Sequence, residues 1–197
     1  MALVLFSGVV VDDALENETK DLRFLYEEKA RAELTAADAL APGSDTVGWQ
    51  GCLTPAIAVV KGLPGPAEAA GGAALSGADG DAVLKALEKL GHDPAQVFFT
   101  LSRPDAGLTA EARLARLRAQ IEAVDAPLVI ALDAEAAEDL ARAHSAPTMP
   151  FGQPVRVAGR RIVACDGLEA ALSLGDERSK LRVWKQLSAA VPEPPIF

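Results

Sequence analysis

Short apolar segments alternate with longer amphipathic segments along most of this sequence. The apolar segments, rich in β-branched and aromatic residues and ended by glycine, proline or polar residues, are 56–60, 96–100 and 128–132. A short, unbroken apolar run bounded by turn residues is typical of a buried strand. Two further short runs, 155–157 and 161–164, are joined across Gly159 and predict a hairpin, or a strand with its lead-in.

The amphipathic segments repeat apolar residues at helical spacing. They predict helices over 17–40, from an Asp81 cap to Gly91, from a Thr109 cap to Val124, from an Asp133 cap to Ala143, and after an Asp176 cap. The expected inward faces are Leu22, Leu25, Tyr26, Ala30, Leu34 and Ala37; Val83, Leu84, Leu87 and Leu90; Leu114, Leu117, Ile121 and Val124; and Leu181, Trp184 and Leu187. Arg113, Arg116 and Arg118 are expected mostly on the other faces of their helix, and 69–80 is expected to be a small-residue loop.

Strands that alternate with helices predict a parallel sheet with helices on both faces. We therefore expect an α/β fold, a three-layer α/β/α sandwich with a central, mainly parallel sheet. A length of 197 residues predicts a single domain over 1–197, with an N-terminal extension over 1–45 and a Pro-rich tail over 191–197. The prolines of the tail cannot continue the last helix.

The N-terminal run from Met1 to Val11 is apolar, but no basic residue precedes it and Asp12-Asp13 closes it. This pattern is a poor signal peptide and predicts an edge or buried strand, so we expect a cytoplasmic protein. No apolar run approaches the length of a membrane span, and we expect no membrane partner.

Composition narrows the chemistry. The chain has 19 basic and 28 acidic residues and a net charge of −9. Neutralisation of phosphates supplies most non-specific affinity for DNA, so this balance disfavours a DNA partner, although an acidic protein can carry a local basic patch. Cys52 and Cys165 are too few for a disulfide scaffold or a four-cysteine cluster, and His92 and His144 have no nucleophile beside them. We expect no metal, no cofactor and structural roles for these four residues.

The candidate site is the loop after the first predicted strand. Gly62, Leu63, Pro64 and Gly65 form a tight, stiff loop because they combine two glycines with a proline. In an open α/β sheet, ligands bind just outside the carboxyl ends of the strands. The loop lacks the spacing of a dinucleotide or P-loop fingerprint, so it does not indicate a nucleotide site. A plain turn is the alternative.

Five segments of the chain have a family's order and spacing: 59–68, 75–80, 97–104, 127–137 and 162–172. Their shared positions are Pro64-Gly65, Glu68, Gly77, Gly80, Thr100, Arg103-Pro104 and the strand 129–132. This pattern resembles the uracil-DNA glycosylase superfamily, and within it the bacterial and archaeal branches that often carry an Fe–S cluster. The resemblance covers about 47–187 and implies that family's α/β fold and a role in DNA repair.

The family's chemistry, as the resemblance implies it, flips a base out of DNA into a pocket. An aromatic residue stacks on the base, an Asn reads its edge, a first-loop acid or amide handles the water, and a late His-Pro stabilises the departing uracil. Here Gly62 takes the place of the acid, Leu75 of the aromatic, Leu101 of the Asn and Asp166-Gly167 of the His-Pro, and the cluster cysteines are absent. A one-residue gap would instead align Gly62-Leu63 with a Gly-Leu-Ala-Pro loop found in some branches, without restoring the other positions.

These departures predict a degenerate member that kept the scaffold and lost the reaction. A missing oxyanion donor costs on the order of 100- to 1000-fold in rate. Loss of base reading or of base stacking costs about 1–3 kcal/mol each. Leu63, Leu75 and Leu101 would make the former pocket apolar. We expect a binding or scaffold protein whose partner is a protein, a small ligand or, less favourably, DNA; the alternative is a divergent DNA glycosylase with altered active-site residues.

Charged residues near the predicted pocket each have two interpretations. Asp166 acts as a base or binds a cation, or it caps a turn with Gly167. Glu68 is a retained loop acid, or a surface or helix-capping residue. Arg103 faces DNA or the pocket mouth, or pairs with an acidic neighbour. Arg160 and Arg161 contact DNA or another anion, or they belong to a mixed, solvated surface together with Arg156, Lys180, Arg182 and Lys185.

Overall fold

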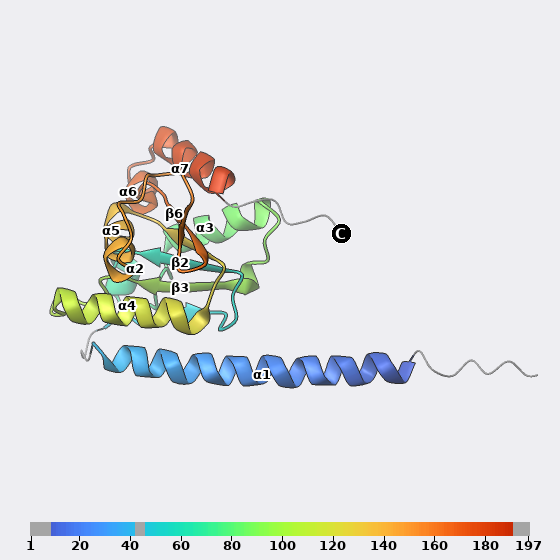
Figure 1. The fold of residues 1–197 in the computed structure, drawn as a ribbon. Helices are drawn as coiled ribbons and strands as arrows, with labels where there is room; N and C mark the ends of the chain where they lie inside the picture. The colour runs from blue at the N-terminus through green and yellow to red at the C-terminus, as the bar shows by residue number, and fades with distance from the viewer. Residues whose placement is uncertain (1–8, 42–45, 191–197) are drawn as a thin grey trace, which may run out of the picture.

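The computed structural model describes residues 9–41 and 46–190 (Figure 1). The predicted tail over 191–197 and the first residues of the predicted N-terminal strand lie outside this range. The helices are α1 (Val9–Ala39), α2 (Pro66–Ala69), α3 (Ala78–Lys89), α4 (Ala110–Val124), α5 (Ala134–Ala143), α6 (Leu168–Ser173) and α7 (Glu177–Ala190), with a 3-10 turn at Pro94–Gln96. The strands are β1 (Gln50–Gly51), β2 (Ile57–Lys61), β3 (Val97–Leu101), β4 (Leu128–Ala131), β5 (Val155–Val157) and β6 (Arg160–Ala164).

The strands form one mixed sheet in the order β1-β3-β2-β4-β6-β5. The inner strands β3, β2, β4 and β6 run parallel, while the short strands β1 and β5 pair antiparallel at the two edges. β2, β3 and β4 are buried along their whole length, which explains why their sequences are nearly continuous apolar runs rather than alternating patterns. The predicted, mainly parallel sheet is confirmed, and β5 and β6 form the predicted hairpin, which turns through Ala158 and Gly159 at positive φ.

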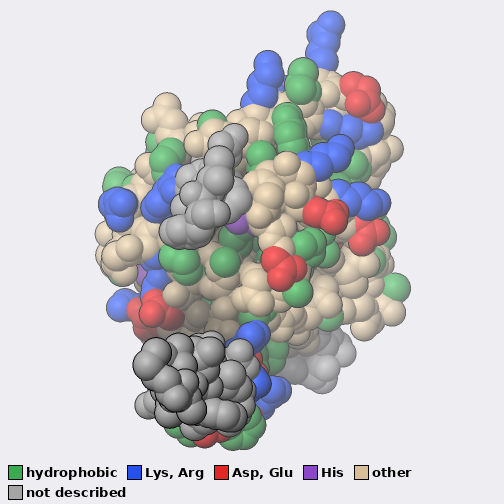
Figure 2. Space-filling view, turned by 90° about the vertical axis from the view of Figure 1, so that its right-hand side faces the viewer, with side chains coloured by type: hydrophobic (Ala, Val, Ile, Leu, Met, Phe, Trp, Pro, Cys, Tyr) green, Lys and Arg blue, Asp and Glu red, His purple; other side chains and the backbone are tan. Residues whose placement is uncertain are grey.

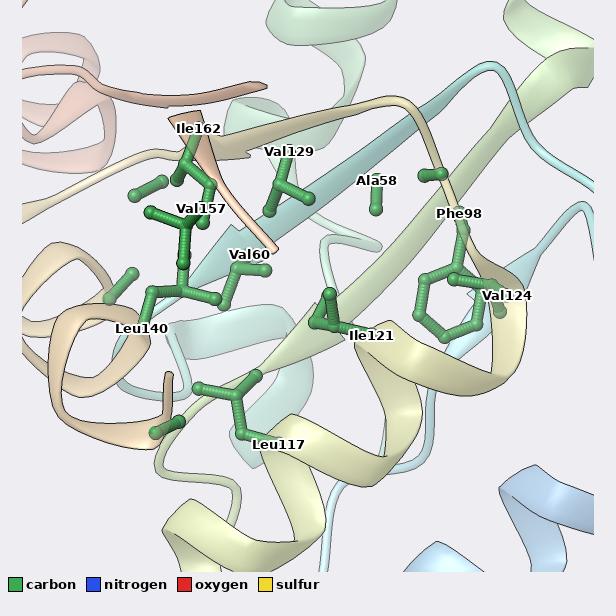
Figure 3. Packing of buried hydrophobic residues seen from close by; sticks show 14 of the residues in the cluster. Ala58, Val60, Phe98, Leu117, Ile121, Val124, Val129, Leu140, Val157 and Ile162 are labelled. Atoms are coloured by element: carbon green, nitrogen blue, oxygen red, sulfur yellow. The ribbon is translucent and has the colours of Figure 1, made fainter. Parts of the chain in front are cut away.

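Helices enclose the sheet on both faces, as in an α/β sandwich (Figure 1). On one face, Figure 3 shows Leu117 and Ile121 of α4 and Leu140 of α5 packed toward Val60 and Val129 of the strands. On the other face, the core residues contributed by α3, α6 and α7 are Val83, Leu87, Leu168, Val183 and Leu187. Each face of the sheet therefore has its own apolar core.

α1 adds a further layer, because it lies mainly against α4 (Figure 1). Ala30, Leu34 and Ala37 are buried in this contact, as predicted. The other predicted inward residues are exposed: Leu22 by 51%, Leu25 by 62% and Tyr26 by 62%. The prediction of a strand over the N-terminal apolar run is wrong for Val9 to Val11, which are helical.

A polar network joins α1 to α4 beneath this layer. Arg116 of α4 is 1% exposed, so the expectation that it faces outward is wrong. Its Nε donates to Asp38 Oδ1 of α1 at 3.0 Å, and Gln120 Nε2 donates to the same oxygen at 2.8 Å. Trp49 Nε1 donates to Asp38 Oδ2 at 3.2 Å. Burial lowers the pKa of Arg116, and the Asp38 carboxylate opposes that shift.

Helix starts follow the predicted caps in part. Thr109 and Asp133 cap α4 and α5, and each side chain accepts the N–H of the third residue beyond it. Asp81 is not a cap, because α3 begins at Ala78 after the N-cap Gly77. The segment 69–80 is accordingly not all loop, since it contains the end of α2 and the start of α3.

The last part of the chain differs from its predicted packing. α6 is a short helix that the sequence pattern did not indicate. In α7, Val183 and Leu187 are buried, whereas the predicted Leu181 is 52% exposed. No helix in the described part of the chain combines the length and the apolar character needed to cross a membrane.

Candidate functional site

The carboxyl ends of β2 and β4 lie side by side, and the connections that leave them run to opposite faces of the sheet. The connection after β2 runs through α2 and α3, and α3 packs on one face of the sheet; the connection after β4 runs through α5 on the other face. Neighbouring strands with connections on opposite faces leave a crevice between their ends, where open α/β proteins bind ligands. Gly62 follows β2, and its N–H donates to Oδ2 of Asp133, the residue that caps α5, at 2.8 Å. The predicted loop therefore lies at this crevice.

Lys61, the last residue of β2, holds the central charge of this region and is only 3% exposed. Its ammonium lies 2.7 Å from Asp79 Oδ2, 3.0 Å from Glu169 Oε2 and 3.3 Å from Glu68 Oε1. Burial by itself would lower the pKa of Lys61, but the hydrogen bonds to Asp79 and Glu169 and the carboxylate charges raise it overall. A lysine held in its charged form is a structural cation and a poor nucleophile. We call these four residues the Lys61 cluster.

Glu68 is the most heavily bonded carboxylate of the Lys61 cluster. It is 3% exposed, and besides Lys61 it accepts the N–H groups of Gly65 at 3.0 Å and Leu75 at 2.8 Å. The bond to Gly65 places Glu68 in the capping arrangement at the start of α2. The bond to Leu75 holds a backbone at φ +56°, which a bulky side chain rarely adopts. Glu68 thus has the helix-capping role that was one of its two interpretations.

Asp79 and Glu169 differ in their access to solvent. Both lie in the first turn of a helix, where a carboxylate is favoured by the exposed N–H groups. The side chain of Asp79 is 5% exposed, whereas that of Glu169 is 37% exposed. Glu169 is therefore the member of the Lys61 cluster that can turn into water.

Two small cavities flank the Lys61 cluster. One, of about 240 Å³, is lined by acidic side chains of three helices, by Lys61 and by apolar residues that include Leu63. Its carboxylates come from Asp79, Asp133, Glu135 and Glu169. The other, of about 270 Å³, lies between Pro66 and Leu172, and Asp79 and Glu169 line both cavities. Burial raises the pKa of Asp133, although the N–H groups of Ala136 and Gly62 oppose the shift.

A larger cavity, of about 700 Å³, opens on the other side of the first loop. It lies between 46–48, 69–73 and 104–106, with Pro64 and Glu68 in its wall. Most of these residues are small, and the hydrogen-bonding groups they offer are largely backbone. The carboxylates in its wall are those of Glu68, which is already bonded, and of Asp105, whose Oδ1 accepts the N–H of Gly107 at 2.7 Å.

Asp166 does not reach the cavity beside Lys61. Its carboxylate accepts Gln186 Nε2 at 3.0 Å and lies 3.5 Å from Arg182 Nη1, and both partners belong to α7. Its N–H donates to Gln186 Oε1 at 2.9 Å. Gly167, which follows it, is the N-cap of α6. Asp166 is thus bound to α7 just ahead of a helix start.

The three leucines that the resemblance assigns to the family's pocket lie in different environments. Leu75 and Leu101 are 4% and 0% exposed and belong to the core on the α3 side of the sheet. Leu63 is 52% exposed at the edge of the acidic cavity. The cavity is therefore neither closed by these leucines nor entered by Asp166.

The three candidate arginines do not form one surface. Arg103 follows β3, and its Nε donates to Asp139 at 2.7 Å while Nη2 donates to Glu138 at 3.0 Å. Arg160 is 8% exposed and pairs with Asp125 at 2.7 Å. Arg160 and Arg161 are the first residues of β6, so they lie at the amino ends of the parallel strands, whereas Arg103 lies at the carboxyl ends. Arg103 thus has the acidic neighbours that were the alternative to a DNA contact.

The cysteines and histidines do not line the two small cavities beside Lys61. Burial raises the pKa of the Cys165 thiol to about 12, so it is unreactive at neutral pH. The Nε2 atoms of His92 and His144 are buried without a hydrogen-bond partner. In the part of the chain that the structure describes, no group of three or more His, Cys, Asp or Glu residues is arranged to hold a metal ion.

Three members of the Lys61 cluster were not among the site residues predicted from the sequence: Lys61, Asp79 and Glu169. One signal was present, since a lysine that directly closes a fully apolar run is a charge at the end of a buried strand and needs a partner. Which carboxylates pair with it depends on the tertiary fold. Glu169, for example, comes from a short helix far along the chain.

No protein-family model and no curated protein matches this sequence. The function proposed below therefore rests on the geometry of the site and on the resemblance of its motifs.

Gly65→Val is expected to destabilise the protein by about 1–3 kcal/mol, as overpacking does. Gly65 has φ −91°, which any residue adopts, so the constraint is space and not backbone strain. A Cβ at this position would lie 2.7 Å from Lys61 Nζ and closer still to the Glu169 carboxylate. A valine would therefore push Glu169 away from the ammonium. Thermal unfolding should show a fall of several degrees in Tm.

Gly48→Val is the matched control, because a Cβ at Gly48 meets nothing within 4 Å. Its Tm should stay close to that of the wild type. If Gly65→Val melts at the same temperature as this control, the close approach of the loop to the Lys61 cluster is not a constraint on stability.

Proposed function

We propose that this chain is a uracil-DNA glycosylase-like α/β domain that does not excise bases and acts as a binding or scaffold protein. The proposal joins the motif resemblance of 59–68 to 162–172 with the chemistry of the crevice between β2 and β4. It assigns to the crevice a structural role in holding the first loop, α3 and α6 together.

The observation that carries the proposal is the bonding of Glu68. A group that activates water needs a lone pair that is open to the substrate. The Glu68 carboxylate is buried and occupied by the ammonium of Lys61 and by two backbone N–H groups. The candidate acid of the first loop is therefore committed to structure.

The geometry at Gly62 supports the same conclusion. The resemblance places the family's first-loop acid here. A Cβ on Gly62 would lie 2.5 Å from Glu135 Cβ and 2.7 Å from Asp133 Oδ1, so larger side chains do not fit without a shift of α5. The other positions that the resemblance assigns to chemistry are also engaged, since Leu75 and Leu101 are core residues and Asp166 is bound to α7.

The charge of the cavity opposes base excision as well. The departing uracil is an anion and needs hydrogen-bond donors or positive charge. The cavity beside Gly62 instead presents the carboxylates of Asp133, Glu135 and Glu169, and its one lysine is shared among three carboxylates. An approaching phosphodiester would meet the same repulsion.

A divergent glycosylase is the second candidate. In its favour, the acidic cavity is open at the carboxyl ends of β2 and β4, and the Glu169 side chain is 37% exposed there. In this alternative Glu169, and not Asp166 or Glu68, would supply the base.

The test is uracil release from single-stranded and duplex uracil-containing DNA at high protein concentration, with an active uracil-DNA glycosylase run in parallel. Binding to the same DNA is measured over a range of salt concentrations. We expect no release above the protein-free blank. Salt-sensitive binding without release would indicate that DNA is the retained partner, and absence of both would direct the search to protein or small-molecule partners.

Uracil release by the wild-type protein would overturn the proposal if a folded variant of this chain no longer released uracil. Glu169→Gln is the informative variant, because its carboxylate is partly exposed and it changes shape little. Asp166→Asn is the matched comparison, since that carboxylate points to α7. Release that is lost only in Glu169→Gln would establish the second candidate.

A further inference from the structure

The outward face of α7 combines basic and apolar side chains. Arg178, Leu181, Arg182 and Lys185 follow the i, i+3, i+4 and i+7 spacing of one helix face, and all four are exposed. The opposite face of the helix packs into the core through Val183. α7 lies at the outer end of the molecule in Figure 1. We call these four exposed side chains the α7 stripe.

The β5–β6 hairpin adds positive charge on the same side of the sheet. Val155 and Val157 pack against the core on the α4 side, so Arg156 between them points to the α7 side. The loop before β5 contacts α7, because a Cβ on Gly152 would lie 3.0 Å from Gln186 Cγ. Figure 2 shows Lys and Arg side chains at the top of the molecule, with hydrophobic and acidic side chains among them.

The acidic residues nearby neutralise only part of this charge. Glu177 pairs with Lys180, which lies outside the stripe, at 2.8 Å. Asp166 lies 3.5 Å from Arg182, a weak contact for an ion pair in water. Asp176 accepts hydrogen bonds from Ser179 and from a backbone N–H at the start of α7. Among the described residues, Arg178 and Lys185 form no ion pair.

Large aliphatic side chains distinguish this surface from an ordinary basic patch. Leu181 is 52% exposed within the stripe, and Leu174, in the turn before α7, is 83% exposed. Aliphatic side chains add little to the binding of a phosphodiester backbone, which takes ionic and hydrogen bonds. They do enter the boundary between headgroups and acyl chains, and basic residues beside them attract anionic headgroups.

We propose that the α7 stripe, with Leu174 and Arg156, is a surface by which this protein binds an anionic lipid bilayer. Arg178, Arg182 and Lys185 contact the headgroups, and Leu174 and Leu181 enter the interface. The net charge of the chain is −9, so the remaining surface is repelled by the same membrane, which orients the protein with α7 toward it. The expectation of no membrane partner rested on the absence of an apolar run long enough to span a membrane. A contact with the membrane surface needs no such run.

The test is co-sedimentation of the full chain with phosphatidylcholine vesicles that contain or lack phosphatidylserine. We expect binding only to the vesicles with phosphatidylserine, and weaker binding as salt is added. Arg178→Gln, Arg182→Gln and Lys185→Gln combined should weaken binding about 100-fold, since each basic residue near the surface contributes about fivefold. Leu174→Ser with Leu181→Ser should weaken the binding that persists at high salt.

The matched control combines Lys29→Gln, Lys85→Gln and Lys89→Gln, which remove the same charge from exposed positions on α1 and α3. It should keep the wild-type affinity. An equal loss in this control, equal binding to neutral vesicles, or no vesicle binding by the wild-type protein would each overturn the proposal. Binding of a single-stranded oligonucleotide without any vesicle binding would also overturn it, and would assign the stripe to nucleic acid.

Discussion

Replacing Lys61 by methionine is expected to lower the free energy of unfolding by about 3–5 kcal/mol at neutral pH, the cost of leaving buried charge without its partner. Methionine keeps an unbranched, apolar stem, so the packing at the end of β2 changes little. The buried carboxylates of Glu68 and Asp79 would lose their shared cation, while Glu169, at 37% exposure, can turn to water. Denaturant unfolding at pH 7 measures the difference.

Lys85→Met is the matched control, because Lys85 is exposed on α3. It should change the free energy of unfolding by less than about 0.5 kcal/mol. If the two methionine variants are equally stable, the carboxylates around Lys61 are solvated, and the structural role assigned to the Lys61 cluster is wrong.

The raised pKa of Lys61 gives the same comparison a second readout at alkaline pH. An unfolded lysine titrates near 10.5, and a group whose pKa is raised by folding contributes its full stabilisation below that value. The contribution is lost as the pH rises through the folded-state pKa. The wild type should therefore lose stability above pH 10.5 more steeply than Lys61→Met, which has no group to titrate there.

The strands were predictable because their burial shows directly in their own residue types. β2, β3 and β4 are buried on both faces, so all of their positions except Lys61 and Thr100 are apolar, and the runs stand out from the polar turns around them. The caps Thr109 and Asp133 were predictable for a similar reason, since a cap bonds to its own helix. The ends of the strands were less predictable. β2, for example, ends at Lys61 and not at Val60, because the end of a strand depends on its pairing with neighbouring strands.

The buried charges were not predictable from the same pattern. Arg116 lies on the polar side of α4 by periodicity, but α1 covers that side and supplies Asp38 as a partner. The spacing of apolar residues in α7 predicted that Leu181 faces the core, but Val183 is buried there and Leu181 is exposed. In each case the outcome depends on which element packs alongside, and the spacing of residues within one helix does not contain that information.

The position of the candidate site was predictable from the sequence, but the residues that fill it were not. The position of the loop at the carboxyl end of a central strand followed from the order of strands and helices. The content of the crevice did not, because Lys61 gathers carboxylates from α2, α3 and α6. The positions at which the chain departs from the pattern of the resemblance were visible in the sequence. The ion-paired Lys61 cluster beside them, which supports the proposed loss of reaction, became visible only in the fold.

Asp38→Ala is expected to cost about 2–4 kcal/mol, because it leaves the buried guanidinium of Arg116 without its carboxylate. The value stays below that for a fully buried pair, since the Asp38 side chain is 41% exposed. Gln120 and Trp49 lose their acceptor in the same variant. Denaturant unfolding measures the cost, and Trp49 fluorescence should shift in the folded state because its Nε1 is released.

Asp21→Ala is the comparison for this prediction, because Asp21 lies on the same helix but is exposed. It should leave both stability and Trp49 emission unchanged. If Asp38→Ala matched it in both measurements, α1 would be an appendage that packs without contributing to stability. If instead Asp38→Ala behaves as expected, α1 belongs to the cooperative unit, because one carboxylate on it fixes α4 through Arg116 and the strand connector through Trp49.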